Sequence, residues 1–467
     1  MSYKYLFLLI FLANSSYGAG LTNKIKELVK NHGFSLNSLG IYVQEVNKKK
    51  PLVAINSRKL FTPASVVKLA TTYAALLELG PNYRWPTNFY TNGTLKNGVL
   101  KGNLVIKAFG NPDLITEDLE PITQAIANQG LKIISGDLII DRSYFKTNNN
   151  NSARFDKNIY SPYNALPDAM MFNHRASKIL LKPGENKIRV LRDLPDTSYV
   201  ILNHLKPSKK SCSGKRAWPK IKLTTYKNKP AIKFHGIYSL RCPEREIYRV
   251  MTKPYYMFYH GLKFKLAARD IWLKGILKLR KIPKNSKKLF IFESRPLLKI
   301  ISKINKKSNN VMARQTLLTL GAKKYGAGAT YKTGVKAVNH SLRQHNVINN
   351  PLKIKNGSGL SRSAKLSALA LTKILWHAYN RFGTSWKNTL AIMGVDGTLK
   401  KRLRKSKIKG KAWMKTGSLK NTISIAGYLK TRSNKLYTVV ILQNDKNVKK
   451  KGQALHNKIL QLLHSSI

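Results

Sequence analysis

Apolar and polar positions in the first part of the chain follow helix-like and strand-like periods in turn. A helical period runs from about Leu21 to Asn31, and two strand-like runs follow at Gly40–Val46 and Leu52–Asn56. The polar segment Asn47–Lys50 between these runs predicts a turn that joins two antiparallel strands.

A strong second helix is expected directly after these strands. Thr62 is a suitable N-cap and Pro63 suits the first helical position, because proline has no N–H to lose there. The apolar run continues through Leu79 and stops at Gly80 and Pro81. The pattern therefore predicts a buried helix over 63–79.

The middle of the chain, residues 85–296, changes to short strand-like runs separated by Asn, Gly and Pro. The tract Asn148–Asn151 is expected to be a polar loop. We interpret 85–296 as an inserted β-rich accessory region with two nested subdomains. The runs that define it are Leu104–Phe109, Leu138–Ile140, Lys187–Leu191 and Lys220–Thr225.

The last part returns to helices and then to strands. Helices are expected over Pro296–Tyr325, Ser367–Phe382 and Gly452–Leu463, and a meander of three strands precedes the last of them. Those strands are Ala412–Thr416, Ile423–Leu429 and Leu436–Leu442. With the two early strands they predict an α+β fold, in which a five-stranded antiparallel sheet flanked by helices is assembled from both ends of the chain. Residues 19–84 and 297–467 would form this domain.

An apolar run at Tyr5–Ala13 follows Lys4 and precedes the small residues Ser16 and Gly18. This arrangement is typical of a secretory signal peptide, here residues 1–18, and the run is too short to span a bilayer. We therefore expect an exported protein of the periplasm or cell envelope.

The charge is extreme: 85 Lys and Arg oppose 20 Asp and Glu, for a formal net charge of +65. The basic residues are spread along the chain without a helix-turn-helix, zinc-finger or RNA-binding signature, so no nucleic-acid partner is predicted. Such a charge does favour electrostatic association with an anionic membrane surface.

Cys212 and Cys242 are the only cysteines. Two thiols without clustered histidines cannot form a four-ligand zinc site, so no metal is predicted. In an oxidising compartment a disulfide is expected, with two free buried cysteines as the alternative.

Ser65 and Lys68 stand in the first turns of the predicted helix. Their i, i+3 spacing places the hydroxyl and the amine on one helix face, where a neutral amine can take the hydroxyl proton. Burial of Lys68 would disfavour its charged form and lower its pKa. The Ser-x-x-Lys pattern is weak alone, and it recurs at Ser143 and Ser406, where no function is assigned.

Two further motifs strengthen the assignment. Ser308 and Asn310 stand near the start of a helical run, and Lys415-Thr416-Gly417 ends a strand pattern. Ser-x-x-Lys, Ser-x-Asn and Lys-Thr-Gly in this order form the motif set of penicillin-binding proteins and β-lactamases. A second Lys-Thr-Gly at 332–334 lies outside a strand pattern and is interpreted as coincidence.

On these motifs the chain resembles the class C low-molecular-mass penicillin-binding proteins, which are serine D-alanyl-D-alanine carboxypeptidases and endopeptidases. The resemblance covers nearly all of the mature chain, and the long insert between Ser65 and Ser308 separates it from β-lactamases. Four further motifs carry it: Gly110–Pro112, Pro162–Pro167, Asn356–Arg362 and Gly394–Leu399. Asn356 departs from the family, which usually has Asp there.

The resemblance implies peptidoglycan stem peptides as substrates, β-lactams as covalent inhibitors and no cofactor. Ser65 would be the nucleophile and Lys68 its base, while Ser308 would relay a proton and Asn310 would hold the substrate amide. Lys415 and the residues after it would bind the substrate: Thr416, Gly417 and Ser418. A catalytically silent wall-binding protein of the same fold, or a β-lactamase, is the alternative.

Overall fold

The structure is a computed structural model that describes residues 18–147, 155–156 and 158–467. The chain folds into two compact units. The first unit contains the residues up to Tyr83 together with Pro296–Tyr325 and Tyr331–Ile467, and the second contains Arg84–Arg295 and Gly326–Thr330. The sequence pattern places 326–330 in the first unit, but Ala329 forms a bridge with Phe145 of the second.

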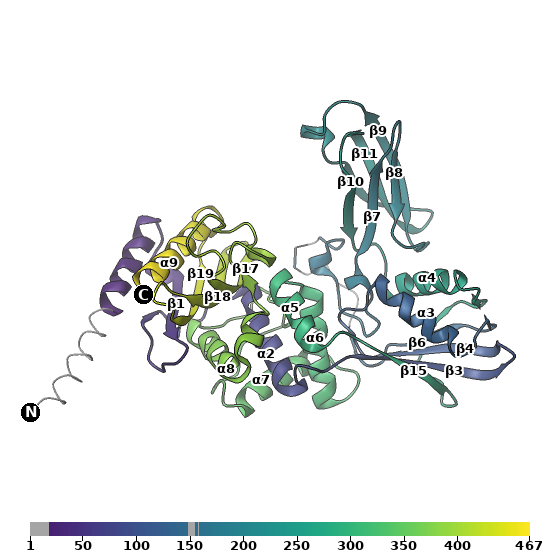
Figure 1. Cartoon of the computed structure of the whole chain (residues 1–467), viewed down its shortest axis with the longest axis horizontal. Helices are drawn as coiled ribbons and strands as arrows, with labels where there is room; N and C mark the ends of the chain where they lie inside the picture. The colour runs from purple at the N-terminus through teal and green to yellow at the C-terminus, as the bar shows by residue number, and fades with distance from the viewer. Residues whose placement is uncertain (1–17, 148–154, 157) are drawn as a thin grey trace, which may run out of the picture. The chain divides into compact units, whose positions relative to one another are not determined.

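One antiparallel sheet forms the centre of the first unit (Figure 1). Its strand order is β16-β17-β18-β19-β1-β2, so strands from the two ends of the chain pair as β1 with β19. The sheet has six strands rather than the expected five, because β16 is only two residues long and too short for a period-2 pattern. The strands are β1 (Leu39–Glu45), β2 (Val53–Ile55), β16 (Ala391–Ile392), β17 (Ala412–Leu419), β18 (Thr422–Lys430) and β19 (Leu436–Asn444).

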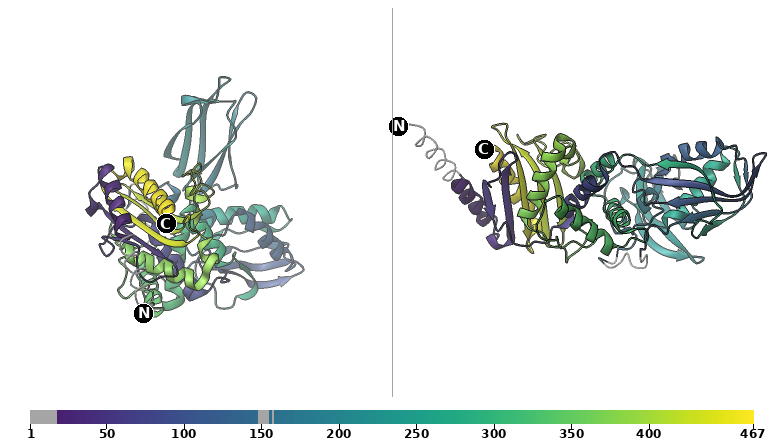
Figure 2. Two further views of the ribbon diagram at one scale, coloured as in Figure 1. Left: turned by 60° about the vertical axis from the view of Figure 1, so that its left-hand side comes forward. Right: turned by 90° about the horizontal axis from the view of Figure 1, so that it is seen from below.

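Helices cover both faces of this sheet. The helix over residues 18–31 and α9 (Gln453–Ser466) share one apolar cluster with the sheet, and the two helices lie side by side in the views of Figures 1 and 2. Contacts from α8 (Ala368–Lys387) reach β1, β18 and β19. The other helices of this unit are α2 (Lys68–Leu79), α5 (Leu297–Lys307), α6 (Asn310–Tyr325) and α7 (Tyr331–Gln344).

Two predicted helices differ from the structure at points that matter for the site. Thr62 is not an N-cap, because the helix begins with a 3-10 turn, η2 (Ala64–Val67), and Ala64 is left-handed with φ +49°. The Thr62 backbone N–H instead donates to Asn444 Oδ1. The predicted helix over 296–325 is broken between α5 and α6, because Ser308 is left-handed with φ +56°.

The second unit contains a sheet of seven strands and two helices that the sequence pattern did not predict, α3 (Leu119–Ala127) and α4 (Pro254–Ala267). Part of the sheet is a path of five strands, β13-β5-β4-β3-β15, and β6 joins it beside β4. The strands are β3 (Pro86–Lys96), β4 (Val99–Ala108), β5 (Ile133–Ile134), β6 (Leu138–Asp141), β13 (Trp272–Leu273), β14 (Leu277–Leu279) and β15 (Lys287–Glu293).

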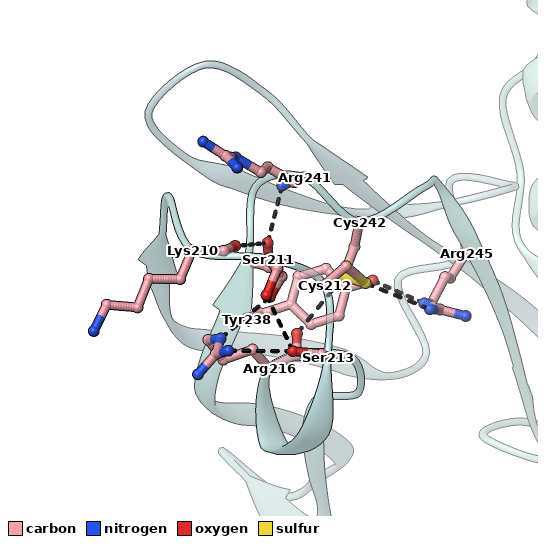
Figure 3. The surroundings of a disulfide bond; sticks show 10 residues. Lys210, Ser211, Cys212, Ser213, Arg216, Tyr238, Arg241, Cys242 and Arg245 are labelled. Carbon is pink, nitrogen blue, oxygen red and sulfur yellow. Dashed lines mark hydrogen bonds between the residues drawn. A yellow bond between two sulfur atoms is a disulfide. The ribbon is translucent and has the colours of Figure 1, made fainter.

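Residues 177–249 of this unit form two three-stranded sheets around a separate apolar cluster, and we call them the β module (Figure 1). One sheet has the order β10-β11-β9 and the other β12-β7-β8. The strands are β7 (Ser177–Pro183), β8 (Ile188–Arg192), β9 (Val200–Ser208), β10 (Lys220–Tyr226), β11 (Lys229–Ser239) and β12 (Arg245–Arg249). Cys212 and Cys242 form a disulfide at one end of the module, which confirms the expected pairing (Figure 3).

The predicted signal peptide lies outside the described residues except for Gly18, and so does the tract Asn148–Asn151. None of the helices in the described residues is long and apolar enough to cross a membrane.

Candidate active site

Ser65 and Lys68 meet at the start of α2. Ser65 lies in the 3-10 turn η2 and Lys68 is the first residue of α2, so the short turn brings Lys68 Nζ to 3.0 Å from Ser65 Oγ. A loop closes over this turn, since a Cβ added to Gly359, whose φ is +82°, would lie 2.0 Å from the Ala64 carbonyl oxygen. Only glycine permits this approach, which fixes the backbone beside Ser65.

Lys68 is fully buried and has two acceptors besides the Ser65 hydroxyl. Its Nζ donates to Asn310 Oδ1 at 2.7 Å and to the backbone carbonyl of Ser358. Burial, and then the positive charges of Lys415 and Arg314, hold the pKa of the Lys68 amine well below its usual value. A neutral amine has two N–H groups, so these two acceptors leave its lone pair for the Ser65 hydroxyl.

Ser308 and Asn310 flank the break between α5 and α6. Ser308 is the C-cap of α5, and its left-handed conformation ends that helix. Such a conformation costs free energy in a non-glycine residue and is concentrated at functional sites. Asn309 Oδ1 accepts from the Met312 backbone N–H, so the middle residue of the motif caps α6. Asn310, the first residue of α6, is thereby directed at Lys68.

Lys415 is the second buried lysine of the site and lies on β17. Its Nζ donates to Ser308 Oγ at 2.8 Å and to the Thr416 carbonyl at 2.6 Å. Burial lowers the pKa of Lys415 to about 7. Since Lys415 bonds Ser308 and Lys68 bonds Ser65 and Asn310, the three motifs converge on one place.

Gly417 and Ser418 continue β17 past the nucleophile. A Cβ on Gly417 would lie 2.8 Å from the Ser65 backbone nitrogen, so glycine allows this strand and the η2 turn to touch. Within the described part of the chain, β16 pairs with β17 only at Trp413 and Met414. The edge of β17 from Lys415 onward is therefore open to an added backbone.

A cavity of about 510 Å³ lies over these groups. Lys401 and Arg402 contribute positive charge to it, and its lining contains no carboxylate among the described residues. Ser65 and Ser308 also line it, together with Thr416, Gly417 and Ser418. Of the predicted catalytic and substrate-binding residues, Lys68 and Lys415 are fully buried and do not line it, and neither does the partly buried Asn310. In the part of the chain that the structure describes, no group of three His, Cys, Asp or Glu is placed to hold a metal ion.

Three residues of the site have roles that the sequence did not predict. The Ser358 carbonyl binds Lys68, and Asn356 Oδ1 holds that residue by accepting from its N–H and its hydroxyl. Thr398 Oγ1 accepts from Thr416 Oγ1 at 2.9 Å and lines the cavity. The motifs Asn356–Arg362 and Gly394–Leu399 mark these segments, but a backbone acceptor has no side-chain signature.

The repeated motifs lie in other surroundings. Ser143 belongs to the second unit, and Ser406 Oγ accepts from Gln461 Nε2. The second Lys-Thr-Gly lies inside helix α7, where it cannot form a strand edge. Among the three Ser-x-x-Lys serines, Ser65 is thus distinguished by its hydrogen bond to a lysine at the start of a buried helix.

Comparisons with known proteins agree with this geometry. The family model described as D-Ala-D-Ala carboxypeptidase 3 (S13) matches residues 21–464. A D-alanyl-D-alanine carboxypeptidase, DacB, of Haemophilus influenzae is 24% identical over 419 residues, which cover 84% of this chain and 82% of that protein.

Solved structures show the same fold. The crystal structure of penicillin-binding protein 4 (dacB) from Haemophilus influenzae superposes with a TM-score of 0.77 at 22% identity, covering 94% of this chain and 97% of that one. The same protein complexed with a β-lactam has a TM-score of 0.73 at 21% identity, with the same coverage.

Proposed function

The chain belongs to the D-Ala-D-Ala carboxypeptidase 3 (S13) family and is a serine-type D-alanyl-D-alanine carboxypeptidase, and we propose that Ser65 is its nucleophile. The hydrogen bonding of Lys68 supports this assignment. With its two N–H groups directed at Asn310 Oδ1 and the Ser358 carbonyl, the neutral amine presents its lone pair to the Ser65 hydroxyl.

The reaction then proceeds by acyl transfer. Ser65 Oγ attacks the carbonyl carbon of the penultimate D-Ala while Lys68 takes the hydroxyl proton. The C–N bond to the terminal D-Ala breaks, and that nitrogen receives a proton through Ser308, which Lys415 holds at 2.8 Å. Water hydrolyses the ester on Ser65 and releases the shortened peptide.

Substrate binding follows from the cationic cavity. Thr416 binds the terminal carboxylate, and the buried Lys415 beside it attracts the carboxylate by its charge. The described residues of the cavity lining add the positive charge of Lys401 and Arg402 and no carboxylate to compete with the substrate. The open edge of β17 at Gly417 and Ser418 receives the peptide backbone, and the amides of Ser65 and Ser418 stabilise the oxyanion.

The same site accounts for two further reactions. A cross-link between D-Ala and a diamino acid has the same D-Ala carbonyl, so endopeptidase cleavage of cross-linked peptidoglycan needs no additional group. A β-lactam presents a strained amide and a carboxylate to the same residues, so β-lactams acylate Ser65 as covalent inhibitors. The β-lactam complex of the Haemophilus protein supports this assignment.

We also propose that the protein is exported and acts in the periplasm or cell envelope. The apolar run Tyr5–Ala13 after Lys4 and the disulfide between Cys212 and Cys242 both support export. The N-terminus of protein isolated from the envelope should lie near Ala19. An N-terminus at Met1 in that fraction would contradict cleavage.

Release of D-alanine tests the activity directly. The full chain is incubated with a stem pentapeptide ending in D-Ala-D-Ala and with a cross-linked dimer, and the products are separated by mass. We expect D-alanine from the first and two monomers from the second, and neither product from Ser65→Ala. The absence of both products together with no labelling by fluorescent penicillin would indicate a silent wall-binding protein, whereas rapid turnover of a chromogenic cephalosporin would indicate a β-lactamase.

A further inference from the structure

One part of the β module carries positive charge without any acidic residue. Residues 200–241 contain 11 Lys and Arg and no Asp or Glu. These residues form the sheet β10-β11-β9 and the loop that carries Cys212 (Figures 1 and 3). The acidic residues of the module lie elsewhere, and Asp193, Glu244 and Glu246 form ion pairs with lysines of β7.

Strand register places the lysines on one face of that sheet. Lys222 of β10 lies directly opposite Lys233 of β11, and Lys220 lies opposite His235. On the other side of β11, His235 is paired with His204 of β9. The alternate residues face the apolar cluster, where Ile232 and Phe234 are fully buried. The lysines and histidines therefore share the outer face, which we call the lysine face.

The lysine face is electrostatically unfavourable for the folded chain. Like charges placed directly opposite on neighbouring strands repel, as Lys222 and Lys233 do. Within the part of the chain that the structure describes, no carboxylate forms an ion pair with Lys220, Lys222 or Lys233. A bound anionic surface would remove this repulsion.

Apolar side chains accompany the charge. Ile237 follows His235 on the outer face of β11 and is 52% exposed, and it lies opposite Lys206. Trp218, two residues before β10, is 57% exposed, and the Arg245 guanidinium lies 4.3 Å from its ring centroid. A soluble polyanion offers no apolar phase for such groups, whereas the boundary of a lipid bilayer accepts both indole rings and lysine ammonium groups.

We propose that the lysine face, with Trp218 and Ile237, is a docking surface for a membrane rich in anionic phospholipid. Lysines near such a surface each strengthen binding, and their effect is screened by salt. The proposal concerns binding alone and does not depend on the reaction at Ser65.

Vesicle sedimentation of the full chain tests it. Vesicles of phosphatidylglycerol and phosphatidylcholine are compared with phosphatidylcholine alone, which controls for apolar binding anywhere in the chain. The variant Lys220→Glu/Lys222→Glu/Lys233→Glu should bind the anionic vesicles about 100-fold more weakly than wild type, at roughly fivefold per lysine. Amide hydrogen exchange in β9 to β11 should be unchanged in this variant, which shows that the β module is folded.

A matched variant distinguishes the contribution of the lysine face to vesicle binding from that of the net charge. Lys284, Lys287 and Lys288 are lysines of the same unit outside the β module. Their triple Glu variant changes the charge equally and should weaken vesicle binding less than about tenfold. Equal losses in the two triple variants would overturn the proposal, because net charge alone would then explain binding.

A second comparison distinguishes an anionic lipid from a soluble polyanion as the ligand. Trp218→Ser/Ile237→Ser should weaken binding to the anionic vesicles several-fold and leave binding of soluble polyphosphate unchanged. If this variant binds vesicles as wild type does, and polyphosphate competes at equal phosphate concentration, the ligand is a soluble polyanion and the lipid assignment is wrong.

Discussion

Lys68 and Lys415 in the first unit are fully buried, whereas Lys220 and Lys222 in the second unit lie exposed on the outer face of a sheet. The buried pair has lowered pKa values and fixed hydrogen-bond acceptors. The exposed pair has neither a carboxylate partner nor a covering element among the described residues. An exposed lysine is thus a charged surface group, whereas a buried lysine can act as a base or interact with one anionic group at a fixed position.

Replacing the buried base Lys68 should impair the enzyme most strongly. Lys68→Arg should keep the fold and lower the rate of acylation by penicillin at pH 7 by about 10²–10⁴-fold, because a guanidinium does not deprotonate in proteins. Lys415→Arg is the matched control, since it preserves a charged partner for the carboxylate and should retain part of the rate. Equal rates for Lys68→Arg and wild type would show that the proton leaves Ser65 by another route, with Ser308 as the candidate.

The pH dependence of the free energy of unfolding should also differ between buried and exposed lysines. The folded-state pKa of Lys415 is about 7, below that of the unfolded chain near 10.4. Between these values the unfolded state binds more protons, so this lysine makes the free energy of unfolding rise with pH, by about 5 kcal/mol in total. Urea unfolding at several pH values should show a smaller rise in Lys415→Met. Lys220→Met, the exposed control, should follow wild type; a matching change there would contradict the role of burial.

The disulfide should stabilise the β module and leave the catalytic unit unaffected. On the chain-entropy account, closing a loop with a sequence separation of 30 contributes about 3–4 kcal/mol. Cys212→Ser/Cys242→Ser should therefore speed amide hydrogen exchange in β9 to β11. Exchange in β17 to β19 and penicillin acylation serve as internal controls. Faster exchange in both sets of strands would mean that the two units do not respond independently.

The smallest effect is a pH dependence. The charged form of Lys415 attracts the substrate carboxylate and is lost as pH rises through about 7. For a D-Ala-D-Ala peptide, kcat/KM should therefore fall about tenfold per pH unit above that value, since this parameter reports the free enzyme. At low pH it should fall because Lys68 becomes protonated. Lys415→Arg should lack the alkaline decline; a decline of the same size in this variant would assign it to another group.

The sequence predicted the architecture of the first unit because its strands carry continuous apolar patterns. The strands at Gly40–Val46, Ile423–Leu429 and Leu436–Leu442 all appear within one or two residues of their predicted bounds. The short β16 escapes prediction because two residues carry no period. The helices α3 and α4 escape it because each lies between the strand-like runs that dominate the middle of the chain.

Local backbone departures in the site could not be predicted from periodicity. Ala64 and Ser308 are left-handed, a conformation unfavourable for both residue types, and each interrupts a pattern that otherwise indicates a continuous helix. Tertiary contacts impose these turns. The motifs identified Ser65, Lys68 and Lys415 by their residue types. The contact of the Ser358 carbonyl with Lys68 depends on tertiary structure and therefore could be recognised only in the fold.

The site of the penicillin adduct identifies the nucleophile. The full chain is treated with penicillin, digested and analysed by mass spectrometry, with Ser65→Ala as the control. One adduct is predicted, on the peptide that contains Ser65, and none in the variant. An adduct on the peptides containing Ser143 or Ser406, or an unchanged adduct in Ser65→Ala, would contradict the assignment of Ser65 as the nucleophile.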